Sequence, residues 1–118
     1  MQFVAVLVRT LRPGVTYDDF IEAWYPDKGF GWTGRGPIVG RSLASERELL
    51  TLGLFELPDE TELDEAMARI AAQEAVRHDR IDEIVESTSL RGIYAVVDEF
   101  DFSTDETVAA GRPPQLER

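Results

Sequence analysis

Two apolar stretches, FVAVLVRT at residues 3–10 and LLTLGLFEL at residues 49–57, decide the fold that this sequence predicts. Successive side chains of a β-strand point to opposite faces, so each stretch presents apolar side chains on both faces. An antiparallel sheet with one face in water would alternate apolar and polar residues instead. We therefore predict that both stretches are strands of a sheet whose two faces are both covered.

A helix is predicted between these strands. Thr16 can cap its first turn, and Asp18 and Asp19 favour the positive end of the helix dipole. Pro26 limits the helix to about ten residues. Its apolar residues share one face: Tyr17, Phe20, Ile21 and Trp24.

The remaining elements complete a simple order. A glycine-rich loop at 29–37, a strand at 38–44 and a turn at 45–48 lead to the second apolar stretch. A helical region then begins at residue 58, bends near 73–77 and ends at 87–92. A strand at 93–102 and a polar tail at 103–118 follow. Strand, helix, strand, strand, helix, strand is the split βαβ arrangement. We predict an α+β, ferredoxin-like βαββαβ domain over residues 1–102, with a four-stranded antiparallel sheet and helices on one face.

One layer of helices covers only one of the two apolar faces. A bare second face would exceed the apolar patch of a few hundred Å² that a monomer usually exposes. We therefore expect a homodimer in which two copies pack sheet against sheet.

The element order, the two-faced strands and the ending VVDEFDF at 96–102 resemble the dimeric α/β-barrel superfamily. Its members include antibiotic-biosynthesis monooxygenases, haem-degrading enzymes, muconolactone isomerase-like proteins and stress-responsive barrel proteins. The resemblance covers residues 2–102 and implies ferredoxin-like subunits joined as a barrel-like homodimer. The haem-degrading members and some cofactor-free monooxygenases use an Asn, which this chain lacks, so the resemblance implies fold and dimerisation rather than an activity.

Composition excludes several functional classes. The 118 residues contain 23 acids and 12 bases, a net charge of −11, which argues against nucleic acid and anionic membranes as partners. The absence of Cys and the single His exclude thiol chemistry and multi-His metal sites. The first apolar run is too short to span a bilayer and lacks the flanks of a secretory signal. We expect a cytoplasmic protein without cofactor or metal.

Aromatic residues concentrate between Tyr17 and Trp32. Phe20 and Trp24 fit the core, whereas Tyr25, Phe30 and Trp32 lie off the helical stripe and either line a pocket or pack against a partner subunit. Trp24, Tyr25, Phe30 and Trp32 are the candidate ligand-binding residues. The G-x-G-x-x-G at 29–34 follows a helix and precedes a strand, the reverse of a dinucleotide site, so it is interpreted as a flexible connection.

His78 is the candidate acid–base residue. On a helix, Glu74 and Asp82 lie four residues to either side of it, where they favour the imidazolium. A histidine at the helix surface is the alternative. The acids and the three arginines of this region, including Arg77, are interpreted as a solvated helix face.

Polar residues that interrupt the strands are further candidates: Arg9, Arg41, Thr51, Glu56, Asp98 and Glu99. Arg41 paired with Asp98 or Glu56 would orient an anionic or carbonyl ligand. Strand ends in water are the alternative. Arg41 and Tyr94 join His78 as candidate catalytic residues.

Two functions remain open. The first is a non-catalytic small-molecule-binding or stress-related dimer, because no arrangement of nucleophile, base and orienting group is recognisable. The second is a cofactor-independent enzyme, a monooxygenase, cyclase or isomerase, acting on a small aromatic or polyketide-like substrate. The aromatic cluster and the resemblance favour the second.

Overall fold

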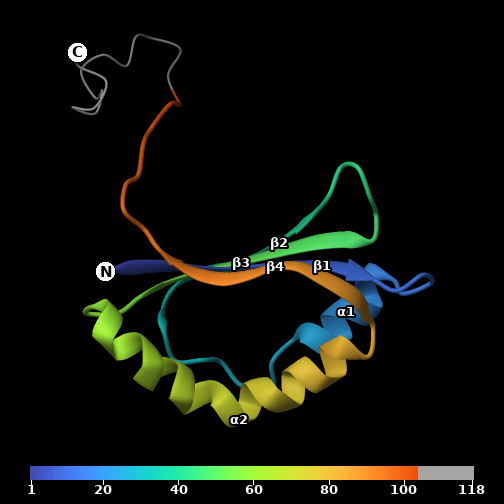
Figure 1. The fold of residues 1–118 in the computed structure, drawn as a ribbon, viewed down its shortest axis with the longest axis horizontal. Helices are drawn as coiled ribbons and strands as arrows, with labels where there is room; N and C mark the ends of the chain where they lie inside the picture. Colours follow the sequence, from blue (N-terminus) through green and yellow to red (C-terminus); the bar gives the residue numbers. More distant parts are fainter. Residues whose placement is uncertain (104–118) are drawn as a thin grey trace.

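The computed structural model describes residues 1–103 and contains a four-stranded antiparallel sheet in the order β2-β3-β1-β4. The elements are β1 (Gln2–Leu11), α1 (Tyr17–Trp24), β2 (Thr33–Arg41), β3 (Glu48–Glu56), a short 3-10 helix (Glu60–Glu62), α2 (Leu63–Asp82) and β4 (Val85–Ala95). Both α-helices lie on one side of the sheet (Figure 1). The predicted ferredoxin-like fold is confirmed. The predicted polar tail lies, from residue 104 on, outside the described residues.

Helix α1 begins as its sequence predicts. The backbone N–H of Asp19 donates to Thr16 Oγ1 at 3.1 Å, and the backbone N–H of Thr16 donates to Asp19 Oδ2 at 2.9 Å. This reciprocal capping box satisfies two backbone donors that the first turn would otherwise leave free. The helix ends at Trp24, two residues before Pro26, and buries Phe20 and Trp24.

Strand β2 begins five residues earlier than predicted and ends at Arg41. Its glycines and proline indicated a loop, but they adapt the strand to an irregular pairing with β3. The register shifts between Arg35 and Ile38, where Gly36 has a φ of +85° that favours glycine. A side chain at Gly34 would collide with the backbone of Leu54. Glycine therefore permits the strand pairing at residues where a loop was predicted.

Helix α2 and strand β4 refine two further predictions. The helix is continuous from Leu63 to Asp82 and is curved through its middle, so the predicted bend takes the form of a curve without an interruption (Figure 1). β4 begins at Val85, so residues 87–92 belong to a strand paired with β1 rather than to the end of a helix. β4 stops at Ala95 because its partner strand, β1, begins at Gln2. The last hydrogen bond between these segments runs from the Val96 N–H to the Gln2 carbonyl. The predicted strand as far as residue 102 is wrong.

The side of the sheet away from the helices is largely apolar. Along β1, Val4, Val6 and Val8 point to this side, because Phe3, Arg9 and Leu11 are buried beneath the helices. We call this surface the open face; its apolar members are Val4, Val6, Val8, Ile38, Leu50, Leu52, Leu54, Leu90 and Tyr94. Within residues 1–103, no helix covers the open face (Figure 1).

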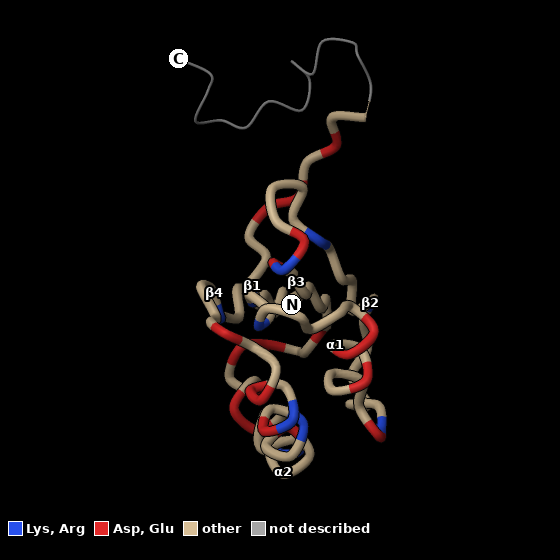
Figure 2. Tube along the Cα trace, turned by 90° about the vertical axis from the view of Figure 1, so that its right-hand side faces the viewer, with Lys and Arg blue, Asp and Glu red and all other residues tan. Residues whose placement is uncertain are grey.

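Charged residues lie mainly on the helices and connections, whereas the strands are mostly uncharged (Figure 2). Neither helix described for residues 1–103 is long and apolar enough to cross a membrane.

The core beneath the helices divides into two clusters. One contains Leu11, Phe20, Trp24, Leu49, Ile81 and Val85, and the other contains Phe3, Phe55, Leu57 and Ala66. Between them Ala5 pairs with Gly53, so the middle of the sheet offers little side-chain volume. The middle of the curved α2 lies farther from the sheet than its ends do (Figure 1). The two ends are therefore packed and the middle is left hollow.

The close approach at Gly34 generates a stability prediction. Gly34→Ala is expected to lower the free energy of unfolding by about 1–3 kcal/mol, because its Cβ meets the β3 backbone. Gly40→Ala in the same strand is the matched control, since a Cβ there meets nothing within 4 Å and should change stability by less than about 0.5 kcal/mol. Urea unfolding measures both; equal stabilities would contradict the strand pairing described here.

Candidate functional site

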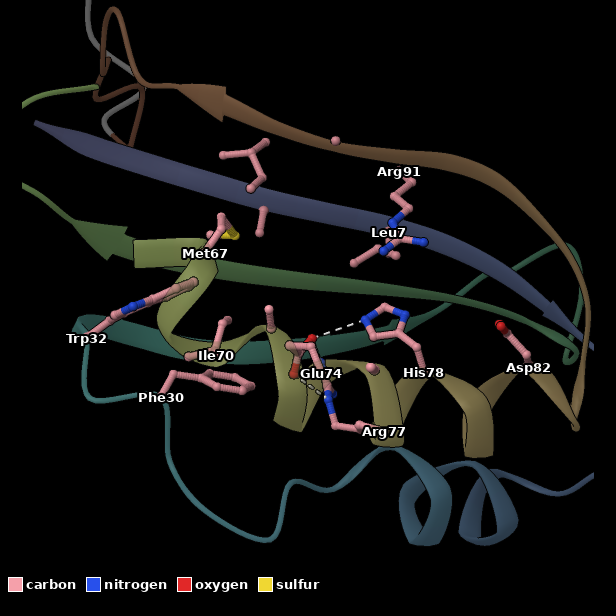
Figure 3. Close-up of a pocket in the computed structure, with 15 residues that line it drawn as sticks. Leu7, Phe30, Trp32, Met67, Ile70, Glu74, Arg77, His78, Asp82 and Arg91 are labelled. Carbon is pink, nitrogen blue, oxygen red and sulfur yellow. Dashed lines mark hydrogen bonds and ion pairs between the residues drawn. The ribbon is translucent and has the colours of Figure 1, made fainter. Parts of the chain in front are cut away.

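A cleft of about 560 Å³ lies between the sheet and α2 (Figure 3). Its walls come from β1, β4, α2 and the segment before β2. The residues that form them are Ala5, Leu7, Phe30, Trp32, Met67, Ile70, Ala71, Glu74, Ala75, Arg77, His78, Asp82, Arg91, Gly92 and Ile93. The cleft occupies the hollow middle of the fold between the two core clusters.

One end of the cleft is apolar and aromatic. Phe30, Trp32, Met67 and Ile70 lie together there (Figure 3). The ring centroids of Phe30 and Trp32 are 5.7 Å apart, and those of Trp32 and Phe55 are 4.4 Å apart, which anchors the indole to β3. The indole Nε1 is buried and has no hydrogen-bond partner among the described residues. A buried N–H group without an acceptor costs free energy.

The other end of the cleft is charged. Glu74 Oε2 accepts hydrogen bonds from Arg77 Nη2 at 2.8 Å and pairs with His78 Nε2 at 3.0 Å, while its Oε1 accepts from Arg77 Nε at 2.9 Å. The imidazole of His78 points toward the sheet, and the side chain of Arg91 extends from β4 toward it (Figure 3). Glu74 thus fixes one nitrogen of the imidazole and leaves Nδ1 without a partner in residues 1–103.

These contacts determine the charge of Glu74. Burial acts to raise the pKa of this carboxyl, but the hydrogen bonds from His78 and Arg77 and the charge of Arg77 outweigh it and lower the pKa to about 2. Glu74 is therefore ionised at neutral pH. An ionised carboxylate beside an imidazole can orient it as a general base.

Arg77 is buried, which corrects the prediction of a solvated helix face. Only 8% of it is exposed. Its Nη1 donates to the carbonyl of Trp24 at 2.8 Å, and its guanidinium lies 5.8 Å from the Trp24 ring centroid and 5.5 Å from that of Phe30. Arg77 therefore connects α2 to the end of α1 and to the aromatic end of the cleft.

Arg9 is buried beneath the sheet, with 3% of its surface exposed. Its one hydrogen bond, from Nη1 to Thr51 Oγ1, is long at 3.5 Å, and its guanidinium lies 6.0 Å from the Phe20 ring centroid. Burial, followed by the charges of Arg77 and Arg91, lowers the pKa of Arg9 to about 10. The group remains charged at neutral pH. Arg9 and Thr51, both polar strand candidates, therefore share the interior side of the sheet.

A second hollow of about 520 Å³ adjoins the cleft beneath the segment 25–37. Trp24, Tyr25 and Thr51 line it. The two hollows share five lining residues, which are Ala5, Leu7, Phe30, Trp32 and Arg77, so the aromatic pair contributes to both.

The structure brings only part of the predicted site together. His78, Phe30 and Trp32 line the cleft, and Trp24 and Tyr25 line the neighbouring hollow. Tyr94 pairs with Val4 on the open face and is 52% exposed, so the sheet separates it from His78.

Arg41 is exposed at the end of β2, opposite Leu49. Glu56 pairs with Thr33 at the other end of β2, and the chain leading to Asp98 leaves the sheet beside Gln2, near Glu56. The proposed pairing of Arg41 with Glu56 or Asp98 is therefore wrong. Arg77 and Arg91, which the sequence interpretation did not single out, occupy the site instead.

Metal ligands are not gathered in the described part of the chain. Within residues 1–103, no three His, Asp or Glu side chains lie close enough together to hold a metal ion.

No protein-family model matches the sequence, and no curated protein is similar to it in sequence. Among solved structures, the fold is similar to that of a "putative antibiotic biosynthesis monooxygenase" from Chloroflexus aurantiacus J-10-fl. The TM-score is 0.56 at 8% sequence identity, and the match covers 86% of this chain and 98% of the other. At this identity the likeness establishes the shared ferredoxin-like fold.

The depressed pKa of Glu74 predicts a pH dependence of stability. A carboxyl whose pKa falls from 4.5 when unfolded to about 2 when folded stabilises the fold fully above pH 5 and loses that contribution toward pH 2. Glu74→Gln should therefore be less stable than the wild type at pH 7, by at most about 3 kcal/mol, and the difference should shrink on acidification.

Urea unfolding at a series of pH values measures this difference. Glu65→Gln is the control, because Glu65 is exposed on the same helix and makes no hydrogen bond or ion pair in the described part of the chain. A gap between wild type and Glu74→Gln that stays constant from pH 7 to pH 3 would contradict the assigned role of Glu74.

Proposed function

We propose that this chain is a small-molecule-binding protein that acts as a homodimer and holds its ligand in the cleft between the sheet and α2. The observation that carries the proposal is the cleft itself, whose wall is aromatic at Phe30 and Trp32 and polar at His78 and Arg91 (Figure 3). A concave, mostly apolar lining with a few polar groups is typical of small-molecule sites.

The shape of the cleft supports a small, flat, amphipathic ligand. Its volume of about 560 Å³ lies within the range of ligand-binding clefts. Phe30 and Trp32 offer ring faces at one end, and Glu74, His78 and Arg91 offer polar groups at the other (Figure 3). An aromatic or polyketide-like molecule with a polar group at one end matches this division.

The open face supports the dimer. It presents an apolar surface that includes Ile38 and Tyr94, each about half exposed, and Leu50 and Leu90, each more than a third exposed. The charges of this chain, whose net charge is −11, lie mainly on the helices and connections (Figure 2). A second copy packed on the open face would remove its apolar surface from water. The resemblance to dimeric α/β-barrel proteins implies the same sheet-to-sheet pairing.

A second candidate function is a cofactor-independent enzyme, favoured by one observation. Glu74 accepts a hydrogen bond from His78 Nε2 and so orients the imidazole in the cleft wall, as proton transfer to or from a bound substrate requires. Such an enzyme would turn over a bound compound, and His78→Gln would abolish turnover while preserving binding. If the wild type binds the compound without turning it over, the enzyme function is excluded and the small-molecule-binding function remains.

Ligand binding is tested by filling the cleft. Titration of the wild type with naphthalene- to anthracene-sized aromatic compounds should change tryptophan fluorescence, because Trp32 lines the cleft. Ala71→Phe, whose new ring enters the cleft, should weaken binding at least tenfold. Ala72→Phe is the matched control on the same helix, since Ala72 does not line the cleft. Equal binding by both variants, or no binding by the wild type, would contradict the proposed site.

Dimerisation is tested on the open face. The wild type should scatter light as two chains at micromolar concentration, and Leu52→Lys should convert it to one, because the substitution places a charge in the middle of the interface. Val76→Lys is the control, since Val76 is exposed on α2, away from the open face. A wild type that scatters as a stable single chain would exclude the dimer.

A further inference from the structure

The charge of Arg9 is not neutralised within the described structure. The residue is buried, yet no carboxylate of residues 1–103 forms an ion pair with its guanidinium. Thr51 supplies a single long hydrogen bond, and the Phe20 ring a distant cation–π contact. A buried cation without an anionic partner costs free energy. Arg9 does not line the cleft, but its charge interacts with those of Arg77 and Arg91, which do.

Arg91 is a second arginine without an ion pair in the described chain, but it is exposed to solvent where it lines the cleft. It extends from β4 toward His78 (Figure 3), and no side chain of the described chain forms an ion pair or hydrogen bond with it. Arg77 also stands here, but Glu74 binds it through two hydrogen bonds, so these two charges cancel. Asp82 is the one remaining carboxylate that lines the cleft. The two positive and two negative charges that line the cleft therefore balance. The excess positive charge at the polar end is that of Arg9, which is buried, does not line the cleft and interacts with Arg77 and Arg91.

We propose, on the basis of the function proposed above, that the ligand is an aromatic carboxylate. Its carboxylate group lies at the polar end, toward Arg91 and the buried charge of Arg9, and its ring system lies toward Phe30 and Trp32.

The chemistry of the cleft selects this class. A guanidinium presents parallel N–H donors that match the two oxygens of a carboxylate. A doubly charged phosphate would be repelled by Glu74 and Asp82, which flank the same space, whereas a single negative charge restores neutrality. An amine would add a cation to a region that already has one in excess.

Three probes of one shape test the inference. Titration calorimetry with 2-naphthoate, neutral 2-naphthamide and cationic 2-naphthylmethylamine should rank the carboxylate about tenfold tighter than the amide, with the amine weakest. Arg91→Gln should remove the preference for the carboxylate and preserve amide binding. Arg41→Gln is the control, because it removes the same charge from an exposed strand end outside the cleft. Added salt should reduce the preference, as it does for exposed charges.

The outcomes separate this inference from the proposed function. Equal affinity for naphthoate and naphthamide would overturn the carboxylate assignment and leave a neutral-ligand cleft. An unchanged preference in Arg91→Gln would overturn the role of Arg91, and with it the inference. If none of the three probes binds, both the inference and the proposed function fail. Arg9→Gln adds a second readout: provided that circular dichroism shows it folded, it should weaken naphthoate binding more than naphthamide binding.

Discussion

The arrangement of the cleft depends on the guanidinium of Arg77. This side chain donates to the last carbonyl of α1, binds both oxygens of Glu74 and lies between the rings of Trp24 and Phe30. Through these contacts one residue holds two helices and the aromatic segment in fixed relation, although that segment has no regular structure between Pro26 and Trp32. Glu74, held by Arg77, in turn orients His78. The aromatic and the charged ends of the cleft are therefore positioned by one ion pair.

Small residues decide that a cleft exists at all. A helix packed on a sheet normally fills the space between them to the density of an organic crystal. Here Ala5 and Gly53 face each other in the sheet, and Ala71 and Ala75 face them from α2, while the large side chains gather in clusters at the two ends. The ends contribute the apolar burial that stabilises the fold, and the middle is left hollow. Stability and the proposed binding would thus depend on different parts of one interface.

The sequence predicted the architecture well, because strand and helix order follow from local patterns of apolar residues and from the Thr16 cap. The sequence prediction failed where strand pairing overrides local preference. Gly34 and Gly36 are typical of a loop, but here they lie in a strand that pairs with β3. Residues 87–92 form a strand because they pair with the free edge of β1. In the site, helical spacing placed Glu74 beside His78. The sequence could not predict whether Arg77 faces solvent or the aromatic segment, because no local pattern predicts where that segment lies.

The two sides of the sheet have separable roles. All walls of the cleft come from one chain and lie on the helix-facing side, whereas the apolar surface lies on the open face. A partner on the open face would cover neither Trp32 nor Arg91. Each chain of a dimer would then hold a complete cleft, and the two clefts would lie on opposite sides of the paired sheets. In β1, Ala5 and Leu7 line the cleft, whereas Val4, Val6 and Val8 lie on the open face. Any coupling between two such clefts would therefore have to pass through strands that contribute to both surfaces, as β1 does.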